Sequence, residues 1–359
     1  MKILHVVGAR PNFPKVAPVM AKLAEYPARF TQFLIHTGQH YDYEMSEIFF
    51  EHLGIRHPDE FLNVGSASHA VQTAAIMTAF EPIAIKHKPD WVFVVGDVNS
   101  TLACALVCSK LGIPVAHVEA GLRSRDRTMP EEINRVLTDQ VSDLLFTPSR
   151  DAGENLQREG IDPHKICFVG NVMIDTLIQL LPSALQRQKQ RELHLQPKNY
   201  VLVTLHRPSN VDNNKTLVDL LRALADISRD IPVIFPVHPR TRQRIQDINE
   251  DLPSTLKLIS PLGYLDFLSL TNDARLVVTD SGGVQEETTY LGVACVTVRP
   301  NTERPITITN GTNRLVGSRY EDLLDCFRQT VIQPACARKP PELWDGQAAS
   351  RIAQIMLNL

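Results

Sequence analysis

Several hallmarks of secreted, membrane and nucleic-acid-binding proteins are missing from this 359-residue sequence. Its six cysteines are scattered, with neither a Cys-x-x-Cys pair nor the Cys/His spacing of a zinc site, so we expect reduced thiols, no bound metal and a cytoplasmic protein. The formal net charge is −3 and no block of one sign occurs, which argues against non-specific binding of nucleic acid or membrane surfaces. No apolar run approaches the length of a membrane span, and the first one stops at Gly8, as expected for a strand rather than a signal peptide.

Linkers and repeats are missing too, so the expected division into domains rests mainly on length. Neither Pro-rich linkers nor internal repeats occur, and 359 residues are long for a single hydrophobic core. We expect a first domain at residues 1–180, a second at 181–345 that begins with a polar connector at 181–199, and a last helix at 346–359 that packs back on the first domain. A Gly-x-Gly-x-x-Gly motif is also absent, so we expect no nicotinamide and no other cofactor.

The sequence does contain a regular alternation of short apolar runs and amphipathic stretches. The apolar runs predict buried parallel strands, and the stretches between them predict helices. Each half therefore predicts an α/β, doubly wound, Rossmann-like domain, and we expect the two domains to face each other across a cleft. Strands are expected at residues 2–7, 32–36, 91–95, 115–118, 144–147, 166–169, 200–205, 232–237, 256–259, 276–279 and 294–298. Helices are expected at 15–25, in a segment reaching Gly54, at 66–87 and 98–111, from 131, at 215–228 and 264–272, from 284, and at 320–332 and 347–357.

The stretch from Leu276 to Gly292 carries the most specific signal. An apolar strand is followed by Ser281, Gly282 and Gly283 and then by a helix with acidic residues near its start. Free backbone N–H groups and the helix dipole point at such a turn, and the glycines let a phosphate approach the backbone. Glu287 lies one helical turn past Gly283, where a carboxylate suits a ribose diol. We therefore predict a nucleoside diphosphate across this turn; the alternative is an ordinary strand–turn–helix connection.

Three carboxylates in the first half are candidates for acid–base chemistry. Asp97 and Glu119 end two successive predicted strands, and side chains at the carboxyl ends of parallel strands face one crevice. Glu131 follows a loop rich in arginine and opens a helix behind Pro130. The structural alternatives are a capping role for Asp97 and an ordinary acid in the first helical turn for Glu131.

Cations accompany both predicted sites. Arg10 and Lys15 flank the first strand–loop–helix turn, either as a clamp on a phosphate or sugar or as a solvated surface pair. His206 and His238 end two strands beside the predicted phosphate turn, where each could also be structural. Arg304 follows a neighbouring strand and adds a further cation, unless it serves a helix terminus or an ion pair with Glu303.

Carboxylates facing a sugar nucleotide suit proton transfer at carbon or general-base catalysis of glycosyl transfer. At this point the chain resembles, from end to end, the non-hydrolysing UDP-N-acetylglucosamine 2-epimerase family. The resemblance implies the two-domain GT-B fold that this family shares with one large class of glycosyltransferases. The matching motifs are Gly8-Ala9-Arg10-Pro11, Thr37-Gly38-Gln39-His40, Gly96-Asp97, His117-Val118-Glu119-Ala120-Gly121-Leu122-Arg123, Pro130-Glu131-Glu132-Ile133-Asn134-Arg135, Thr204-Leu205-His206-Arg207, Pro236-Val237-His238-Pro239, Thr279-Asp280-Ser281-Gly282-Gly283-Val284-Gln285-Glu286-Glu287 and Thr302-Glu303-Arg304-Pro305.

The resemblance implies reversible inversion at C2, which interconverts UDP-N-acetylglucosamine and UDP-N-acetylmannosamine for surface polysaccharide. In the family, UDP leaves together with the C2 proton to give 2-acetamidoglucal, and UDP adds back after the proton returns on the other face. Carried over, Asp97, Glu119 and Glu131 would handle the proton and the sugar charge, and which of them is the base stays open. His206 would assist the departing diphosphate, with Arg10 nearby.

The resemblance also assigns the nucleotide contacts and a homodimer. Ser281, Gly282 and Gly283 would hold the phosphates, and Glu287 would hold the ribose. Arg304 would contact the diphosphate or the sugar, and the Leu262 to Phe267 segment would contact the uracil.

The sequence departs from the family pattern at four places. Residues 11–14 and 98–100 differ from the commoner motifs, and a second glutamine after Gln39 and a second arginine after Arg207 are missing. The last two differences put allosteric activation by a second substrate molecule in doubt. Residues 41–46 are similar to the branch that includes archaeal enzymes and epimerases of 2,3-diacetamido uronic acid nucleotides.

Three alternatives to a UDP-N-acetylglucosamine 2-epimerase therefore stay open. One is a 2-epimerase of a UDP-2,3-diacetamido uronate, whose C6 carboxylate could pair with Arg123, Arg125 or Arg127. Another is a glycosyltransferase of the same fold, which would need an acceptor. The last is a non-catalytic nucleotide-binding protein. Both of the latter leave the three carboxylates without a task.

Overall fold

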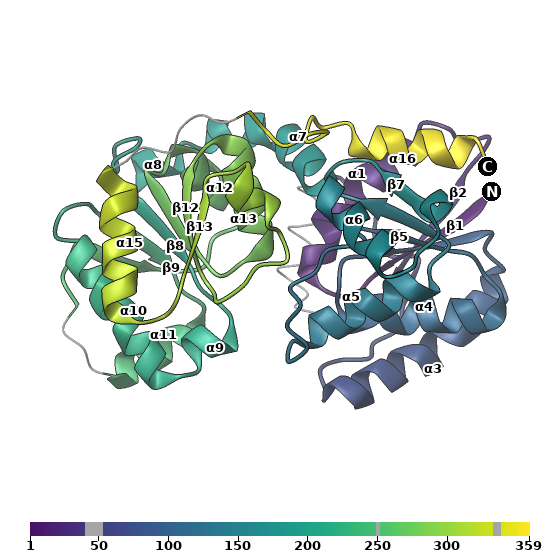
Figure 1. Ribbon diagram of the computed structural model, residues 1–359, viewed down its shortest axis with the longest axis horizontal. Helices are drawn as coiled ribbons and strands as arrows, with labels where there is room; N and C mark the ends of the chain where they lie inside the picture. Colours follow the sequence, from purple (N-terminus) through teal and green to yellow (C-terminus); the bar gives the residue numbers. More distant parts are fainter. Residues whose placement is uncertain (40–52, 249–251, 333–338) are drawn as a thin grey trace. The chain divides into compact units, whose positions relative to one another are not determined.

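The computed structural model describes residues 1–39, 53–248, 252–332 and 339–359. Two parallel sheets with helices make up the described chain, which confirms the α/β, Rossmann-like class (Figure 1). The chain divides into two compact units, the first comprising Met1–Gln179 with Glu342–Leu359 and the second Leu180–Pro341. Residues 342–345 thus lie in the first unit together with the last helix.

The first unit contains a seven-stranded sheet in the order β3-β2-β1-β4-β5-β6-β7 among the described residues. The order reverses between β1 and β4, which is the doubly wound pattern whose switch point holds ligands at the carboxyl ends of the strands. Its strands are β1 (Lys2–Val7), β2 (Thr31–His36), β3 (Glu60–Phe61), β4 (Trp91–Val95), β5 (Val115–Val118), β6 (Leu144–Thr147) and β7 (Ile166–Phe168). Its helices include α1 (Phe13–Ala24), α3 (His69–His87), α4 (Asn99–Leu111), α5 (Pro130–Val141), α6 (Arg150–Arg158) and α16 (Ala348–Leu357), and α7 (Val172–Arg187) leads into the second unit.

The second unit repeats this plan, and its described residues form six strands in the order β10-β9-β8-β11-β12-β13. The switch point here lies between β8 and β11, whose ends pair as Thr204 with Thr279. Its strands are β8 (Val201–Thr204), β9 (Val233–Pro236), β10 (Leu256–Ile259), β11 (Leu276–Thr279), β12 (Ala294–Val298) and β13 (Asn313–Val316). Its helices are α8 (Lys189–Glu192), α9 (Pro208–Val211), α10 (Asn214–Ile227), α11 (Pro239–Ile248), α12 (Tyr264–Asp273), α13 (Gly282–Leu291), α14 (Ile306–Thr309) and α15 (Tyr320–Ile332).

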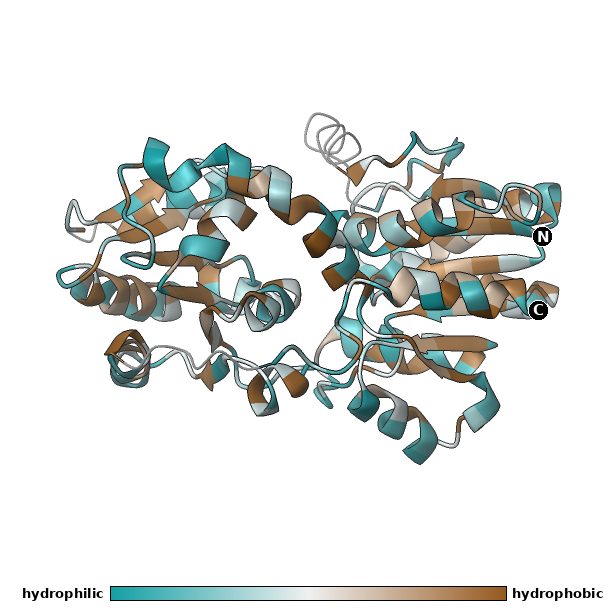
Figure 2. Cartoon of the chain, turned by 90° about the horizontal axis from the view of Figure 1, so that it is seen from above, coloured by the Kyte–Doolittle hydropathy of each residue, from teal (hydrophilic) through white to brown (hydrophobic). Residues whose placement is uncertain are grey.

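The strands are apolar on both faces because helices cover both sides of each sheet. In Figure 2 the strands of both units are mostly brown, whereas many helices carry teal on part of their surface. Val201 and Val203 of β8 join α10 and α15 in one buried cluster, while Leu202 packs with α12 in the other. Alternate residues of a strand point to opposite faces, so a continuous apolar run is what such a strand requires.

The expected elements match the structure apart from a few segments. Gly112 ends α4 at φ 69°, the left-handed conformation expected of a glycine cap. Strands β3 and β13 and the helices α6, α7, α9, α11 and α14 were not expected. The connector at 181–199 is partly helical because Gln, Lys and Arg are good helix formers. The helix expected to reach Gly54 falls largely outside the described residues.

The end of the chain is bound to the first unit by several buried contacts. The Asp175 carboxylate of α7 accepts the backbone N–H groups of Ala348 and Ala349 at 3.1 and 2.7 Å and so caps α16, which packs on α1. Burial raises the pKa of Asp175 to about 6 despite these two hydrogen bonds. Trp344, 2% exposed, donates its indole N–H to the Pro148 carbonyl at 3.0 Å. Within the part of the chain that is described, no helix combines the length and apolarity needed to cross a membrane.

Candidate active site

Two of the predicted carboxylates lie side by side at the carboxyl edge of the first sheet. Asp97 follows β4 and Glu119 follows β5, and these strands are hydrogen-bonded neighbours. Glu119 has φ 74°, a left-handed conformation that strains a residue with a side chain by about 1–3 kcal/mol. Its N–H and that of Ala120 both donate to the Phe146 carbonyl, at 3.1 and 3.0 Å, and so hold this conformation. Backbone strain sustained by its surroundings at a strand end is typical of a functional turn.

Glu119 forms a buried ion pair with Lys15 of α1. The side chains are 4% and 8% exposed, so water screens the pair little. Gly96, at φ +70°, lies against this pair, since a Cβ built there would be 2.9 Å from the Lys15 Nζ and 3.4 Å from the Glu119 Oε2. The predicted cation Lys15 is therefore brought to the predicted carboxylate Glu119, and a glycine is required directly after β4.

Asn12 organises the loop between β1 and α1, a role that the sequence analysis did not foresee. Its side-chain oxygen accepts the N–H groups of Gly8 and Ala9, both at 3.0 Å, and its amide donates to the Val95 carbonyl at 3.0 Å. Asn12 is 1% exposed and joins the ends of the two strands at the switch point. Arg10, the remaining predicted cation of this turn, begins the short 3-10 helix that precedes α1.

Asp97 is held from α5, the helix that carries Glu131. The Arg135 guanidinium forms an ion pair with the Asp97 carboxylate, and the Asn134 amide donates to the Asp97 carbonyl at 2.9 Å. Val98, not Asp97, is the N-cap of α4, so the capping alternative for Asp97 does not hold. Glu131 lies four residues before Arg135 and therefore on the same helix face. Glu131 is half-buried, and its carboxylate forms no hydrogen bond or ion pair with a described residue.

A buried network below the carboxylates fixes the Gly96 turn. His117 contacts the Gly96 carbonyl through Nε2 at 2.8 Å and the Asp139 carboxylate through Nδ1 at 2.6 Å. Burial alone would raise the pKa of Asp139, but the charges of His117 and Arg123 hold it below its usual value. Arg123 also forms a two-pronged ion pair with Glu159, at 2.8 and 2.6 Å.

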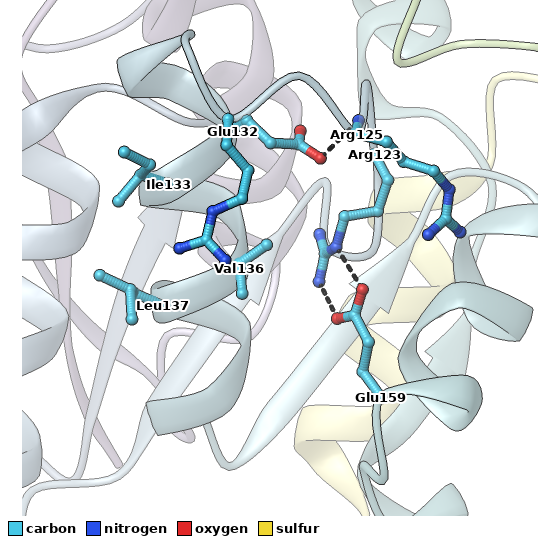
Figure 3. Close-up of a pocket in the computed structure, with 8 residues that line it drawn as sticks. Arg123, Arg125, Glu132, Ile133, Val136, Leu137 and Glu159 are labelled. Carbon is cyan, nitrogen blue, oxygen red and sulfur yellow. Dashed lines mark hydrogen bonds and ion pairs between the residues drawn. The ribbon is translucent and has the colours of Figure 1, made fainter.

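Figure 3 shows the surface pocket next to this network. Arg123 points at Glu159, and the Glu132 carboxylate accepts the Arg125 backbone N–H at 2.7 Å. The Arg125 guanidinium binds the Asn155 side chain at 2.8 Å, whereas Arg127 is exposed. Of the three arginines that could pair with a substrate carboxylate, Arg123 is thus already bound to two protein carboxylates.

In the second unit, the predicted phosphate turn opens α13. Ser281 is the N-cap, and its own N–H donates to the Thr279 hydroxyl at 3.0 Å, which shapes the turn. The helix begins at Gly282, followed by Gly283, and the first turn of a helix has backbone N–H groups without helical acceptors. These amides and the helix dipole form the kind of site that binds phosphate.

Arg304 lies directly against this turn. It forms ion pairs with Glu303 and, at 2.8 Å, with Glu286, and it is 5% exposed, so the predicted ion pair with Glu303 is present. A Cβ at Gly282 would be 2.4 Å from the Arg304 NH1 and 2.8 Å from the Glu303 Oε1. Gly282 is therefore required by the close approach of the guanidinium to the helix start.

Glu287 faces Tyr264 in the interior of the second unit. The Tyr264 hydroxyl donates to its carboxylate at 2.8 Å, and Glu287 is 3% exposed. Burial raises the pKa of Glu287 to about 7, the Tyr264 hydrogen bond opposes this rise, and the Glu286 charge adds to it. The nearby Leu262 and Phe267 are partly buried and pack on the hydrophobic cluster under α12.

His206 and His238 end the neighbouring strands β8 and β9. His206 contacts the buried Asp280 carboxylate through Nδ1 at 2.9 Å, while its side chain remains 62% exposed. His238 is exposed and accepts the Arg240 N–H at 3.4 Å.

The structure thus gathers the predicted residues into two sets. Asp97, Glu119, Lys15 and Arg10 share the carboxyl edge of the first sheet with the first turn of α5, and the predicted residues of the second unit surround the start of α13 and the ends of β8 and β9. Four residues that support these side chains were not predicted as site residues: Asn12, His117, Arg135 and Asp280. Asp280 alone had a usable signal, because it is an acid at the end of an apolar strand, as Asp97 is.

Comparisons with known proteins agree with this geometry. The family model for UDP-N-acetylglucosamine 2-epimerase matches residues 22–357. A UDP-N-acetylglucosamine 2-epimerase of Methanococcus maripaludis is 46% identical over 92% of both chains. A UDP-2,3-diacetamido-2,3-dideoxy-D-glucuronate 2-epimerase of Pseudomonas aeruginosa is 42% identical over the full length of both chains. The crystal structure of the Methanocaldococcus jannaschii UDP-GlcNAc 2-epimerase in complex with UDP-GlcNAc and UDP covers 100% of both chains at 42% identity with a TM-score of 0.91. The chain therefore belongs to the UDP-N-acetylglucosamine 2-epimerase family of isomerases and has its GT-B-type fold.

Proposed function

We propose that this protein reversibly epimerises UDP-N-acetylglucosamine at C2 to UDP-N-acetylmannosamine. The observation that carries the proposal is the cluster of carboxylates at the carboxyl edge of the first sheet, in a chain of this family with a phosphate turn in its second unit. A binding protein would have no use for Glu119 held in a left-handed conformation beside Lys15. The bound UDP-GlcNAc of the Methanocaldococcus jannaschii enzyme supports the choice of substrate.

The proposed reaction begins with loss of the C2 proton and cleavage of the bond between C1 and the diphosphate oxygen. The products of this step are 2-acetamidoglucal and UDP. The proton then returns to the opposite face of C2, and UDP adds back at C1. Asp97, Glu119 and Glu131 exchange the proton and stabilise charge on the sugar, His206 donates to the departing diphosphate, and Arg10 adds positive charge for the substrate.

The proposed nucleotide contacts lie in the second unit. The backbone amides of Ser281, Gly282 and Gly283 bind phosphate, the Glu287 carboxylate binds the ribose hydroxyls, and Arg304 supplies positive charge. The remaining substrate contacts of the proposal are Lys15, His238, Leu262 and Phe267. We also propose a cytoplasmic homodimer that supplies N-acetylmannosamine units for polysaccharide, and light scattering of the purified chain should then give twice the mass of one chain.

Proton NMR with UDP-N-acetylglucosamine in heavy water tests the reaction. Deuterium at C2 together with UDP-N-acetylmannosamine signals is the expected result, because abstraction and return of the proton expose it to solvent. Free N-acetylmannosamine would indicate hydrolysis instead, and an unchanged spectrum would contradict the proposed substrate.

A second candidate substrate is a UDP-2,3-diacetamido uronate, favoured by the Pseudomonas aeruginosa relative. Arg127 is exposed and lines the same pocket as Arg123, so it is a candidate partner for the added carboxylate, whereas Arg123 is bound to Asp139 and Glu159. The same heavy-water experiment with the uronate nucleotide separates the two substrates. A glycosyltransferase would show no exchange at C2 without an acceptor.

A further inference from the structure

A fully buried carboxylate lies behind the exposed imidazole of His206. Asp280 follows β11 and is 0% exposed. Because β8 and β11 pair in register, the chain after β8 passes directly over it, and the backbone N–H groups of His206 and Arg207 donate to its carboxylate at 3.1 and 2.9 Å. The Asn210 amide adds a bond at 3.0 Å. Burial would raise the pKa of Asp280, but the hydrogen bonds from His206, Arg207 and Asn210 hold it below its usual value, so Asp280 is ionised at neutral pH.

The two oxygens of Asp280 have different tasks. Oδ2 accepts the Arg207 N–H and the Asn210 amide, groups that can only donate here, since the same Asn210 nitrogen also donates to the Val298 carbonyl at 3.0 Å. Oδ1 faces the His206 Nδ1 at 2.9 Å, and the His206 backbone N–H is shared between Oδ1 and Oδ2 at 3.2 and 3.1 Å. A carboxylate can only accept, so Nδ1 must carry a proton, and the second ring nitrogen, Nε2, is left for a ligand.

The imidazole is also next to the phosphate turn. Asp280 directly precedes Ser281, the N-cap of α13. The carboxylate behind His206 is therefore adjacent in the chain to the backbone amides at the start of this helix. The Arg207 guanidinium donates to the Asp280 carbonyl at 3.0 Å and fixes the same turn. With a carboxylate on Nδ1, the ring can hold a proton on both nitrogens and donate from Nε2 to an anion in the turn.

We propose that Asp280 is the positioning residue of His206, which holds its Nδ1–H and thereby lets Nε2 donate a proton to the departing diphosphate. Proton donation from Nε2 to the diphosphate rests on the proposed function, whereas protonation of the His206 Nδ1 does not. Asp280 acts through His206 and touches no reacting atom.

The test is ¹⁵N NMR of the His206 ring in the full chain with UDP, compared with Asp280→Asn. In the wild type we expect Nδ1 to be protonated throughout, with protons on both nitrogens when UDP is bound. In Asp280→Asn, the amide oxygen stays on the side of Arg207 and Asn210, which need an acceptor, so its NH₂ faces Nδ1 and the ring becomes the neutral Nε2–H tautomer.

Kinetics give a second readout. General acid catalysis contributes about 10²–10⁴-fold, so Asp280→Asn should lower kcat within that range with a smaller change in KM. If Asp280 acts through His206, the double variant Asp280→Asn/His206→Gln should be no slower than His206→Gln alone. The control is Asn210→Ala, which removes another hydrogen bond from the same carboxylate and should lower the melting temperature without changing the ring tautomer.

Two results would overturn the inference. One is a wild-type His206 ring that is protonated on Nε2 alone, a measurement that needs no variant to fold and no turnover. The other is a double variant much slower than His206→Gln. Lack of C2 exchange with a protonated Nδ1 would instead count against the proposed function alone.

Discussion

Glu287 shows at the scale of one residue how a group proposed to bind the ribose can destabilise the fold that carries it. Its pKa is about 7 in the folded chain against an ordinary 4.5, so the folded state favours the protonated form. The stabilisation is complete below pH 4.5 and is lost as the pH rises through 7, a change of about 3 kcal/mol. At pH 8 the ionised carboxylate therefore destabilises the folded state of the ligand-free protein.

Glu287→Gln should accordingly raise the melting temperature at pH 8 and have little effect at pH 5, because Gln has no charge to bury. UDP affinity should fall about tenfold at pH 8, since a hydrogen bond to a charged group is lost. Differential scanning fluorimetry and calorimetric titration measure both. Glu154→Gln, whose side chain is 58% exposed on α6, is the control and should show no such pH dependence. A lower melting temperature for Glu287→Gln at pH 8 would contradict the argument.

The carboxylates of the first unit differ in what their removal leaves behind. Glu119→Gln leaves the buried Lys15 ammonium without its charge partner and should destabilise the fold by about 3 kcal/mol. Glu131 has no described partner, so Glu131→Gln should leave the melting temperature nearly unchanged. Both variants should lower kcat for C2 exchange at least 10²-fold.

The double variant Lys15→Met/Glu119→Gln separates the two effects of Glu119. Removing both charges should restore much of the stability without restoring activity, because the Glu119 carboxylate is still missing. Denaturant melts and the heavy-water assay on the same samples check this. Recovery of activity in the double variant would mean that Glu119 serves the fold alone.

At the scale of an element, the start of α13 requires a residue without a Cβ at position 282. In Gly282→Ala the new Cβ would be 2.4 Å from Arg304, which cannot move freely because Glu286 and Glu303 bind it in the interior. We expect weaker UDP binding by at least tenfold and a lower melting temperature. Gly153→Ala, in the interior of α6 with its nearest neighbour at 3.7 Å, is the matched control and should stabilise slightly. Unchanged UDP binding in Gly282→Ala would remove Arg304 from the proposed phosphate site.

Elements also show how far the sequence could be read. The apolar runs predict the buried strands, and their carboxyl ends locate Asp97, Glu119 and His206, because a period-2 or continuous apolar pattern is a local signal. The ion partners could not be predicted in this way. Lys15 meets Glu119, and Asp97 meets Arg135, only because the sheet order brings distant loops together. Strand β13 was missed for the same reason, since its residues are half polar and only pairing with β12 makes it a strand.

At the scale of the whole molecule, the last residues of the chain complete the first unit. A chain that stops at Pro341 would lack Trp344, the cap of Asp175 on α16, and the packing of α16 on α1. Hydrogen exchange should then speed up in β1, β4 and β5 while β8 and β11 keep their protection, because the second unit has its own core. A chain that stops at Leu357 loses only exposed residues and serves as the control. Equal protection in both truncated chains would show that the segment is dispensable.

The discontinuity of the first unit also bears on how the protein is made. Residues 1–179 are synthesised before the second unit, yet the first unit also needs residues 342–359, which are synthesised after it. The second unit, Leu180–Pro341, is continuous and fully synthesised before that moment. Domains fold as units once their residues are available, so the second unit can reach its native state while the first unit still lacks its last helix. The second unit can therefore complete its fold before the first, although its synthesis starts later.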